Sequence, residues 1–91
     1  FATGPQGGVT IRSIRPRGYG LPADGPVGAL MARLGLLPRR PAHVHLRITA
    51  PGHQDLTTHL FDRSDPAIAS DPLYAVHPAL LVDLSRTDQG W

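Results

Sequence analysis

Two runs of residues in the middle of the chain alternate between apolar and polar side chains, which is typical of β-strands that are buried on one face. In residues 43–49 the apolar positions share one face, and the polar face carries His43 and His45. Turn-forming residues follow at 50–54, and residues 56–61 then predict a return strand. The pattern therefore predicts an antiparallel hairpin with histidines on one side.

The remaining segments predict short elements that are joined by turns. Alternation in residues 9–14 and an apolar run in residues 80–84 predict two further strands. Residues 15–26 contain three prolines and three glycines, so we expect an irregular, shaped loop there. Residues 62–72 are polar and rich in turn formers, with room for a single helical turn. A mainly β fold is expected.

One short helix is predicted near residues 26–34. Its apolar positions recur at helical spacing and would form one face, made of Val27, Leu30, Met31 and Leu34. Asp24 is placed to cap the first turn, with Pro26 at the start of the helix. Gly35 is a typical helix stop.

Length and composition limit the class of protein. A chain of 91 residues allows one small domain, which we place at residues 1–91. The absence of cysteine excludes disulfides and thiolate metal sites. No apolar run is long enough to cross a membrane, and the sequence from Phe1 onward has no signal-peptide pattern, so we expect a cytoplasmic protein.

The charge pattern argues against a nucleic-acid partner. Every basic residue is arginine and every acidic residue is aspartate, and the formal net charge is only +2. The arginines are spread along the chain from Arg12 to Arg86 and do not form a patch. We therefore expect neither nucleic acid nor membrane as a partner.

The candidate chemistry lies in the pair His43 and His45, because residues two apart on a strand project from the same face and can share one metal ion. Without cysteine, the other ligands must be oxygen donors, and Tyr19 and Tyr74 are the only phenols. Two alternatives remain open at this point. The histidines can simply occupy a solvated strand face, or they can form a bis-histidine site that binds Zn or Cu adventitiously.

The order and spacing of several short motifs carry more information than any one of them. These motifs are Ile14-Arg15-Pro16-x-x-Tyr19, Pro22-x-Asp24-Gly25-Pro26-Val27-Gly28, Arg40-Pro41-Ala42-His43-x-His45, Ala50-Pro51-Gly52-His53 and Leu56-Thr57-Thr58. Together they closely resemble the intradiol ring-cleavage dioxygenases, non-haem ferric enzymes that open catechol-type rings between the two hydroxyl groups. The resemblance runs from about residue 9 to about residue 84 and implies a β-sandwich fold.

The resemblance also implies a metal site. In this family Fe(III) is held by two tyrosines and two histidines, and the positions that match are Tyr19, His43 and His45. The residue types suit the ion, because phenolate is a hard anionic donor that favours ferric iron. The tyrosine matching Tyr19 is displaced by the bound catechol and can then accept a substrate proton.

Further residues take implied roles in catalysis and substrate binding. Arg40 matches an arginine beside the ring, where it stabilises negative charge on the substrate. His59 lies on the return strand where relatives usually carry a glutamine that positions the ring. The positions expected to line an apolar substrate pocket are Leu21, Pro22, Pro72 and Leu73. The substrates to expect are catechol, hydroxyquinol or a substituted catechol, together with O2.

One family ligand has no counterpart in this sequence. The first tyrosine ligand belongs upstream of the strand near Val9, and Tyr74 lies in a segment where relatives place a packing residue. We expect residues 1–91 to be the carboxy-terminal part of a catalytic domain that forms a homo-oligomer or associates with the missing part. The alternative is a truncated, non-catalytic β-sandwich module that has lost iron and activity.

Overall fold

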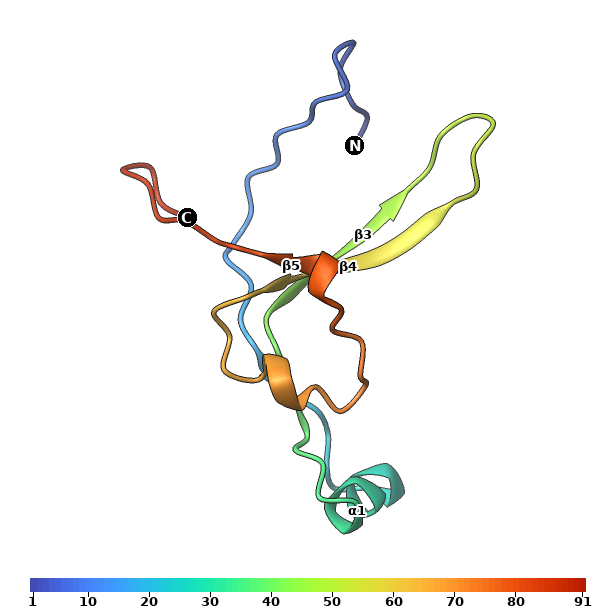
Figure 1. Cartoon of the computed structure of the whole chain (residues 1–91), viewed down its shortest axis with the longest axis vertical. Coiled ribbons are helices and arrows are strands. Elements are labelled where there is room, and N and C mark those ends of the chain that lie inside the picture. Colours follow the sequence, from blue (N-terminus) through green and yellow to red (C-terminus); the bar gives the residue numbers. More distant parts are fainter.

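The computed structural model describes residues 1–91 and is built mainly from strands with a little helix (Figure 1). In chain order the elements are β1 (Tyr19–Gly20), α1 (Pro26–Arg33), β2 (Arg39–Arg40), β3 (His43–Ile48), β4 (Leu56–Asp62), the 3₁₀ turns η1 (Ile68–Ser70) and η2 (Pro78–Leu80), and β5 (Leu81–Val82). None of these helices has the length and apolar character that crossing a membrane requires.

The predicted hairpin is confirmed as strands β3 and β4, which pair antiparallel and project from the body of the molecule (Figure 1). Their register sets His43 opposite Phe61 and His45 opposite His59. The connecting turn contains Gly52 at a φ of +75°, a conformation that glycine adopts without strain. β5 adds to the other edge of β4 in parallel, so the sheet order is β3-β4-β5.

A second, two-stranded sheet forms where β1 pairs with β2, with Tyr19 opposite Arg40. Between these strands the chain makes an excursion that carries α1 (Figure 1). The predicted helix and its stop are confirmed, since Gly35 follows the helix at a φ of +69°. The predicted cap is wrong: Pro26 occupies the first helical position, so the cap falls on Gly25, and Asp24 lies one residue too early.

Three strand predictions need correction. Residues 9–14 form no strand, because no neighbouring strand pairs with their backbone, and Val9 and Ile11 remain half exposed. The loop predicted at residues 15–26 contains β1, which exists only because a distant segment supplies β2. The last strand is limited to the two residues of β5, where β4 offers a partner.

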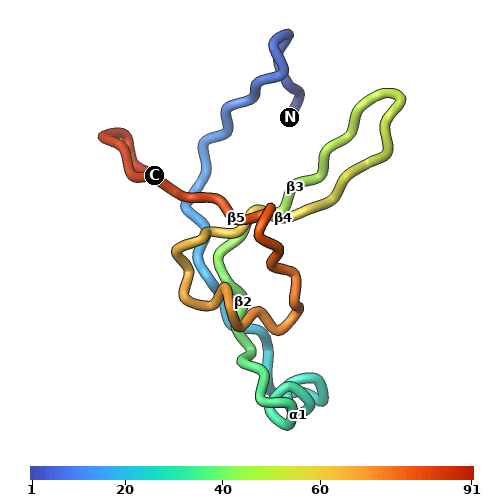
Figure 2. Tube along the Cα trace, in the orientation of Figure 1, coloured from blue at the N-terminus to red at the C-terminus, as the bar shows by residue number.

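The predicted β-sandwich is not confirmed in this chain, because the two sheets stay separate and neither closes. The radius of gyration is 16.3 Å, whereas a compact domain of this length has about 12 Å. Figure 2 shows the amino-terminal arm and the hairpin extending away from the centre. Only 10 of 91 residues are buried; Gly28 and Met31 lie on α1, and most of the others gather where β2, the end of β4 and η1 meet.

Candidate active site

Three histidines gather on the polar face of the β3–β4 hairpin. His45 and His59 lie directly opposite each other in the register, with ring centroids 4.1 Å apart. The His43 ring lies 5.1 Å from that of His45 and 5.4 Å from that of His59. One nitrogen from each ring lies within 4.8 Å of the others, which makes the group a candidate for holding a metal ion.

The backbone around His43 prepares its ring for metal binding. Nδ1 of His43 lies 2.7 Å from the carbonyl oxygen of Pro41, so the neutral ring donates its Nδ1 proton there. This hydrogen bond leaves Nε2 with a free lone pair, which is the arrangement found for most metal-bound histidines. The fully buried ring of Phe61 supports both His43 and His59, at centroid distances of 5.5 and 5.6 Å.

The surroundings of His59 favour its neutral form. Burial lowers the pKa of His59, and positive charge on His45, His43 and Arg40 lowers it further. The ring therefore offers a lone pair or a single donated proton under conditions where an exposed histidine would begin to charge.

Tyr19 reaches the histidines through the pairing of β1 with β2. Its ring centroid lies 5.6 Å from that of His43, and about half of the side chain is exposed. The approach depends on Gly18, where a Cβ atom would lie 2.9 Å from both the Arg40 carbonyl oxygen and a carboxylate oxygen of Asp65. The structure thus brings Tyr19, His43 and His45 together, although these positions are supplied by two separate sheets.

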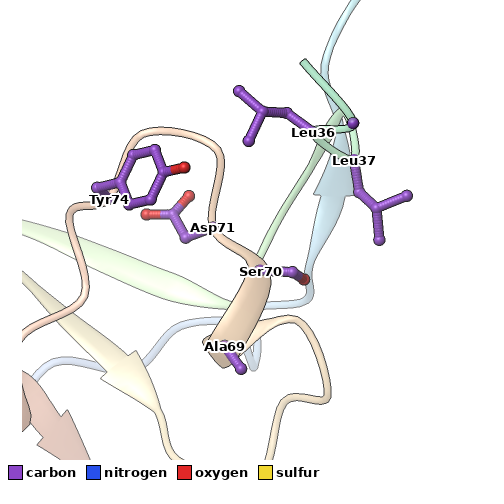
Figure 3. Close-up of a pocket in the computed structure, with 7 residues that line it drawn as sticks. Leu36, Leu37, Ala69, Ser70, Asp71 and Tyr74 are labelled. Atoms are coloured by element: carbon purple, nitrogen blue, oxygen red, sulfur yellow. The ribbon is translucent and has the colours of Figure 1, made fainter. Parts of the chain in front are cut away.

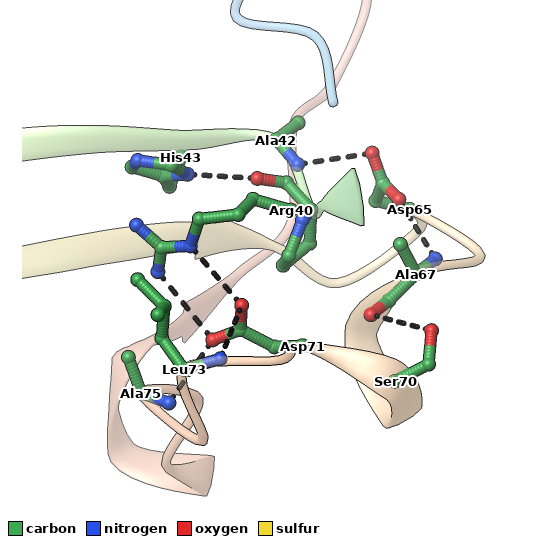
Figure 4. A network of polar contacts seen from close by, with 10 residues as sticks. Arg40, Ala42, His43, Asp65, Ala67, Ser70, Asp71, Leu73 and Ala75 are labelled. Atoms are coloured by element: carbon green, nitrogen blue, oxygen red, sulfur yellow. Dashed lines mark hydrogen bonds and ion pairs between the residues drawn. The ribbon is translucent and has the colours of Figure 1, made fainter. Parts of the chain in front are cut away.

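Arg40 is buried, and Asp71 fixes its guanidinium group (Figure 4). Arg40 Nε and Nη2 donate to the two carboxylate oxygens of Asp71 at 3.1 and 3.4 Å. The hydrogen bond that Arg40 donates to Asp71, the charge of Asp71 and a smaller contribution from Tyr19 raise the pKa of Arg40, against a lowering by burial. The guanidinium is therefore permanently charged and held in a fixed orientation beside Tyr19.

Asp71 organises the turn beneath Arg40 as well. Its carboxylate accepts hydrogen bonds from the amides of Ala75 at 3.0 Å and Leu73 at 3.5 Å (Figure 4). Burial alone would raise the pKa of Asp71, but the hydrogen bonds from Arg40 and these amides outweigh it and hold the pKa below its ordinary range. Asp71 was not among the residues predicted from the sequence, although its place in a polar, turn-rich segment was a usable signal.

A second carboxylate ties the start of β3 to the turn at η1. Asp65 accepts hydrogen bonds from the amides of Ala42 at 3.0 Å and Ala67 at 2.8 Å (Figure 4). This contact fixes Ala42, which precedes His43. Asp65 was not among the residues predicted from the sequence either. Both carboxylates act through backbone geometry that only the fold creates.

The residues predicted to line a substrate pocket are less tightly gathered. Pro72 is buried and Leu73 is exposed, and both follow Asp71 beside Arg40. Leu21 is half-buried and Pro22 is exposed, directly after β1. Their role in substrate binding stays a prediction.

A cavity of about 260 Å³ lies beside Asp71, between η1 and the segment after α1 (Figure 3). Its lining residues are Gly35, Leu36, Leu37, Ala69, Ser70, Asp71 and Tyr74. Tyr74 lines this cavity, and its ring is not among those that contact the histidines. That Tyr74 is not a metal ligand stays a prediction.

The donor set fits a ferric ion. Tyr19 supplies an oxygen that becomes anionic on binding, and His43 and His45 supply neutral nitrogens on the same face. The nearby cation, Arg40, is already paired with Asp71 and adds little net repulsion. The arrangement can bind a metal and an anionic ligand side by side.

Comparison with known proteins gives consistent results. A family model described as dioxygenase matches residues 1–90. The chain is 43% identical to hydroxyquinol 1,2-dioxygenase of Rhizobium sp. (strain MTP-10005), over 97% of the chain and 30% of that enzyme. It is 41% identical to 6-chlorohydroxyquinol 1,2-dioxygenase of Cupriavidus pinatubonensis, over 97% of the chain and 32% of that enzyme.

A solved structure shows the same likeness in three dimensions. The crystal structure of 3-chlorocatechol 1,2-dioxygenase from Rhodococcus opacus 1CP superposes with a TM-score of 0.88 at 39% identity, covering 97% of this chain and 35% of that one. The chain therefore spans about a third of the length of the relatives it matches.

Proposed function

This chain belongs to the intradiol ring-cleavage dioxygenases, and on that premise we propose that it acts in the opening of a catechol-type ring by O2 at a non-haem ferric centre. The observation that carries the proposal is the gathering of Tyr19, His43 and His45 next to a buried, oriented Arg40. We place the enzyme in the cytoplasm, with no nucleic-acid partner.

Hydroxyquinol and substituted catechols are the proposed substrates, and a maleylacetate- or muconate-type acid is the product. Support comes from relatives whose names include hydroxyquinol, 6-chlorohydroxyquinol and chlorocatechol 1,2-dioxygenase. The ring would lie against four apolar positions: Leu21 and Pro22, which follow β1, and Pro72 and Leu73, which follow the Arg40 partner Asp71.

In this proposal Tyr19, His43 and His45 hold the ferric ion. The ion, when bound, supplies Lewis acidity toward the catecholate oxygens and the redox chemistry with O2. The side chain of Tyr19 is about half exposed, and its Oη accepts a proton from a substrate hydroxyl group. The pairing of β1 with β2 keeps the Tyr19 ring beside that of His43.

Arg40 and His59 act on the substrate side. The Arg40 guanidinium cannot lose its proton, and Asp71 holds it in place, so it stabilises negative charge on the bound ring without reorganising. His59, neutral and supported by Phe61, donates one hydrogen bond to a ring substituent or oxygen atom. A histidine here gives the site a donor that also titrates.

We further propose that residues 1–91 are the carboxy-terminal part of a β-sandwich catalytic domain. The exposed aliphatic face of β3 and β4 supports this, since Val44, Ile48 and Leu56 are each about half exposed. That face would pack against the remaining domain or against a second copy of the chain. This is the partner surface that the open sheets require.

The test is the metal content and visible spectrum of the purified chain after loading with ferric iron, before and after adding catechol or hydroxyquinol in air. Bound iron with a phenolate-to-ferric absorption band that shifts with substrate is expected. Tyr19→Phe should remove the band, while Tyr74→Phe, the matched control, should keep it. A colourless, iron-free chain would contradict the proposal and favour the non-catalytic β module.

A further inference from the structure

We propose that His43, His45 and His59 form a three-imidazole site for a divalent cation of the zinc type, which overlaps the ferric site and competes with it. The site itself stands on the geometry of the hairpin. Only the competition with iron rests on the proposed function. The three-imidazole site differs from the ferric site in its third ligand, because His59 takes the place of Tyr19.

Strand register is the first argument. His45 and His59 are directly opposed residues, and His43 precedes His45 by two positions on the same face. Their candidate ligand nitrogens lie within 4.8 Å of one another. Nitrogen ligands on one tetrahedral zinc ion stand about 3.4 Å apart, given Zn–N bonds of about 2.0–2.1 Å. The exposed His45 ring can rotate to close most of this difference.

The second argument is preorganisation. The Pro41 carbonyl holds the Nδ1 proton of His43, so that ring presents Nε2 to the cluster. The buried Phe61 ring supports His43 and His59 from one side and restricts their rotation. Two of the three ligands are therefore held before an ion arrives.

The third argument is electrostatic. Two guanidinium groups lie near the cluster along the chain, and each already has a carboxylate partner: Arg40 with Asp71, and Arg47 with Asp55 at 3.0 Å. A divalent ion at the three rings thus meets little uncompensated positive charge. Three neutral nitrogens and no phenolate suit Zn²⁺ or Co²⁺, whereas ferric iron prefers the anionic oxygen of Tyr19.

The experiment titrates Zn²⁺ into the metal-free chain by calorimetry and records the visible spectrum with Co²⁺ as the probe. One equivalent of Zn²⁺ and the intense absorption of four-coordinate cobalt are expected. His59→Gln should weaken Zn²⁺ binding at least tenfold. The matched control is His53→Gln, since His53 lies in the exposed hairpin turn and its ring bonds to the Pro51 carbonyl, away from the cluster along the hairpin; the Zn²⁺ affinity of this variant should equal that of the unaltered chain.

An NMR measurement on the unaltered chain covers the case in which the variant does not fold. If His59→Gln does not fold, the ring signals of His59 in the unaltered chain, followed by NMR, must still shift with one equivalent of Zn²⁺. His59→Gln that binds Zn²⁺ as tightly as the unaltered chain overturns the inference, as does an unmoved His59 ring.

The ferric-phenolate absorption band, measured with and without Zn²⁺, distinguishes the three-imidazole site from the proposed function. Zn²⁺ should suppress the ferric-phenolate band, and Tyr19→Phe should remove that band while leaving Zn²⁺ affinity unchanged. A His59-dependent Zn²⁺ site without any ferric band would defeat the proposed function and keep the three-imidazole site. A ferric band that persists under saturating Zn²⁺ would overturn the competition.

Discussion

The two faces of the β3–β4 hairpin come from the same thirteen or so residues, yet this chain completes only one of them. On the polar face the rings of His43, His45 and His59 lie close together, and Phe61 supports those of His43 and His59. On the aliphatic face Val44 and Ile48 are 44% and 52% exposed, although their side chains are those that burial stabilises most.

This difference shows that the histidine side chains come together in this chain without the burial of the apolar side chains on the opposite face. The polar face is completed by contacts within this chain. The strand register aligns the rings, the Pro41 carbonyl bonds to His43, and the Asp65 carboxylate bonds to the Ala42 amide. The aliphatic face needs a second layer of protein, which the two small sheets do not provide. A chain can thus present a formed site while lacking much of a core.

The largest effect is expected from removing the carboxylate that pairs with the buried Arg40. Asp71→Ala leaves the Arg40 guanidinium buried without a partner, which costs about 3–5 kcal/mol in the free energy of unfolding. Denaturant unfolding followed by circular dichroism measures this loss. The control is Asp83→Ala, which removes the exposed partner of Arg63 and should cost about 1 kcal/mol or less. Equal losses in the two variants would show that the buried pair has no special role.

The next largest effect separates Tyr19 from the histidines. Gly18→Ala places a Cβ atom 2.9 Å from backbone and carboxylate oxygen atoms, and such overpacking costs about 1–3 kcal/mol. We expect β1 to shift and the ferric-phenolate band to weaken or disappear. Gly25→Ala is the matched control, because a Cβ there meets nothing within 4 Å. A full-strength band in Gly18→Ala would contradict the tight approach.

A smaller effect is expected on lowering the pH. The pKa values of Asp62 and Asp71 lie below their ordinary value of 3.8, so near that pH the unfolded chain binds protons that the folded chain does not. The stabilisation is therefore complete above about pH 5 and is lost as the pH falls through 3.8 and below. Unfolding measured between pH 2 and 6 should show this decline, and Asp71→Asn should flatten it. A pH-independent free energy of unfolding would be inconsistent with the ion pairs of Asp62 with Arg15 and of Asp71 with Arg40.

The smallest effect on stability is expected from the aliphatic face. Val44→Thr keeps the shape of an exposed side chain and replaces a methyl group with a hydroxyl, so it should change the free energy of unfolding by about 0.5 kcal/mol or less. It should nevertheless lower self-association, measured by sedimentation at several concentrations, because a less apolar face attracts a second copy less. Unchanged association would indicate that chains meet through another surface.

The sequence predicted correctly those elements that depend mainly on neighbouring residues. The hairpin followed from alternation, and the helix end followed from Gly35. The pairing of Tyr19 with Arg40 was not predicted, because it joins two short segments that each look irregular on their own. The strand predicted at residues 9–14 failed for the converse reason, since a strand needs a partner that its own pattern cannot supply.

The candidate site divides in the same way. His43 and His45 could be paired from their spacing, and family resemblance added Tyr19, Arg40 and His59. The closeness of His59 to the other two rings required the register of the hairpin. The supporting carboxylate of Asp71 required knowledge of which arginine is buried, and burial is a property of the whole fold.

The pairing of β1 with β2 closes the base of the excursion that carries α1, and a hydrogen bond from the Leu21 amide to the Pro38 carbonyl at 2.7 Å extends that closure. Mutation and recombination can therefore lengthen, shorten or replace the lobe between residues 22 and 37 without altering the spacing of Tyr19 and Arg40. Lineages can diversify this lobe, next to the proposed substrate positions, while inheriting the reactive centre intact.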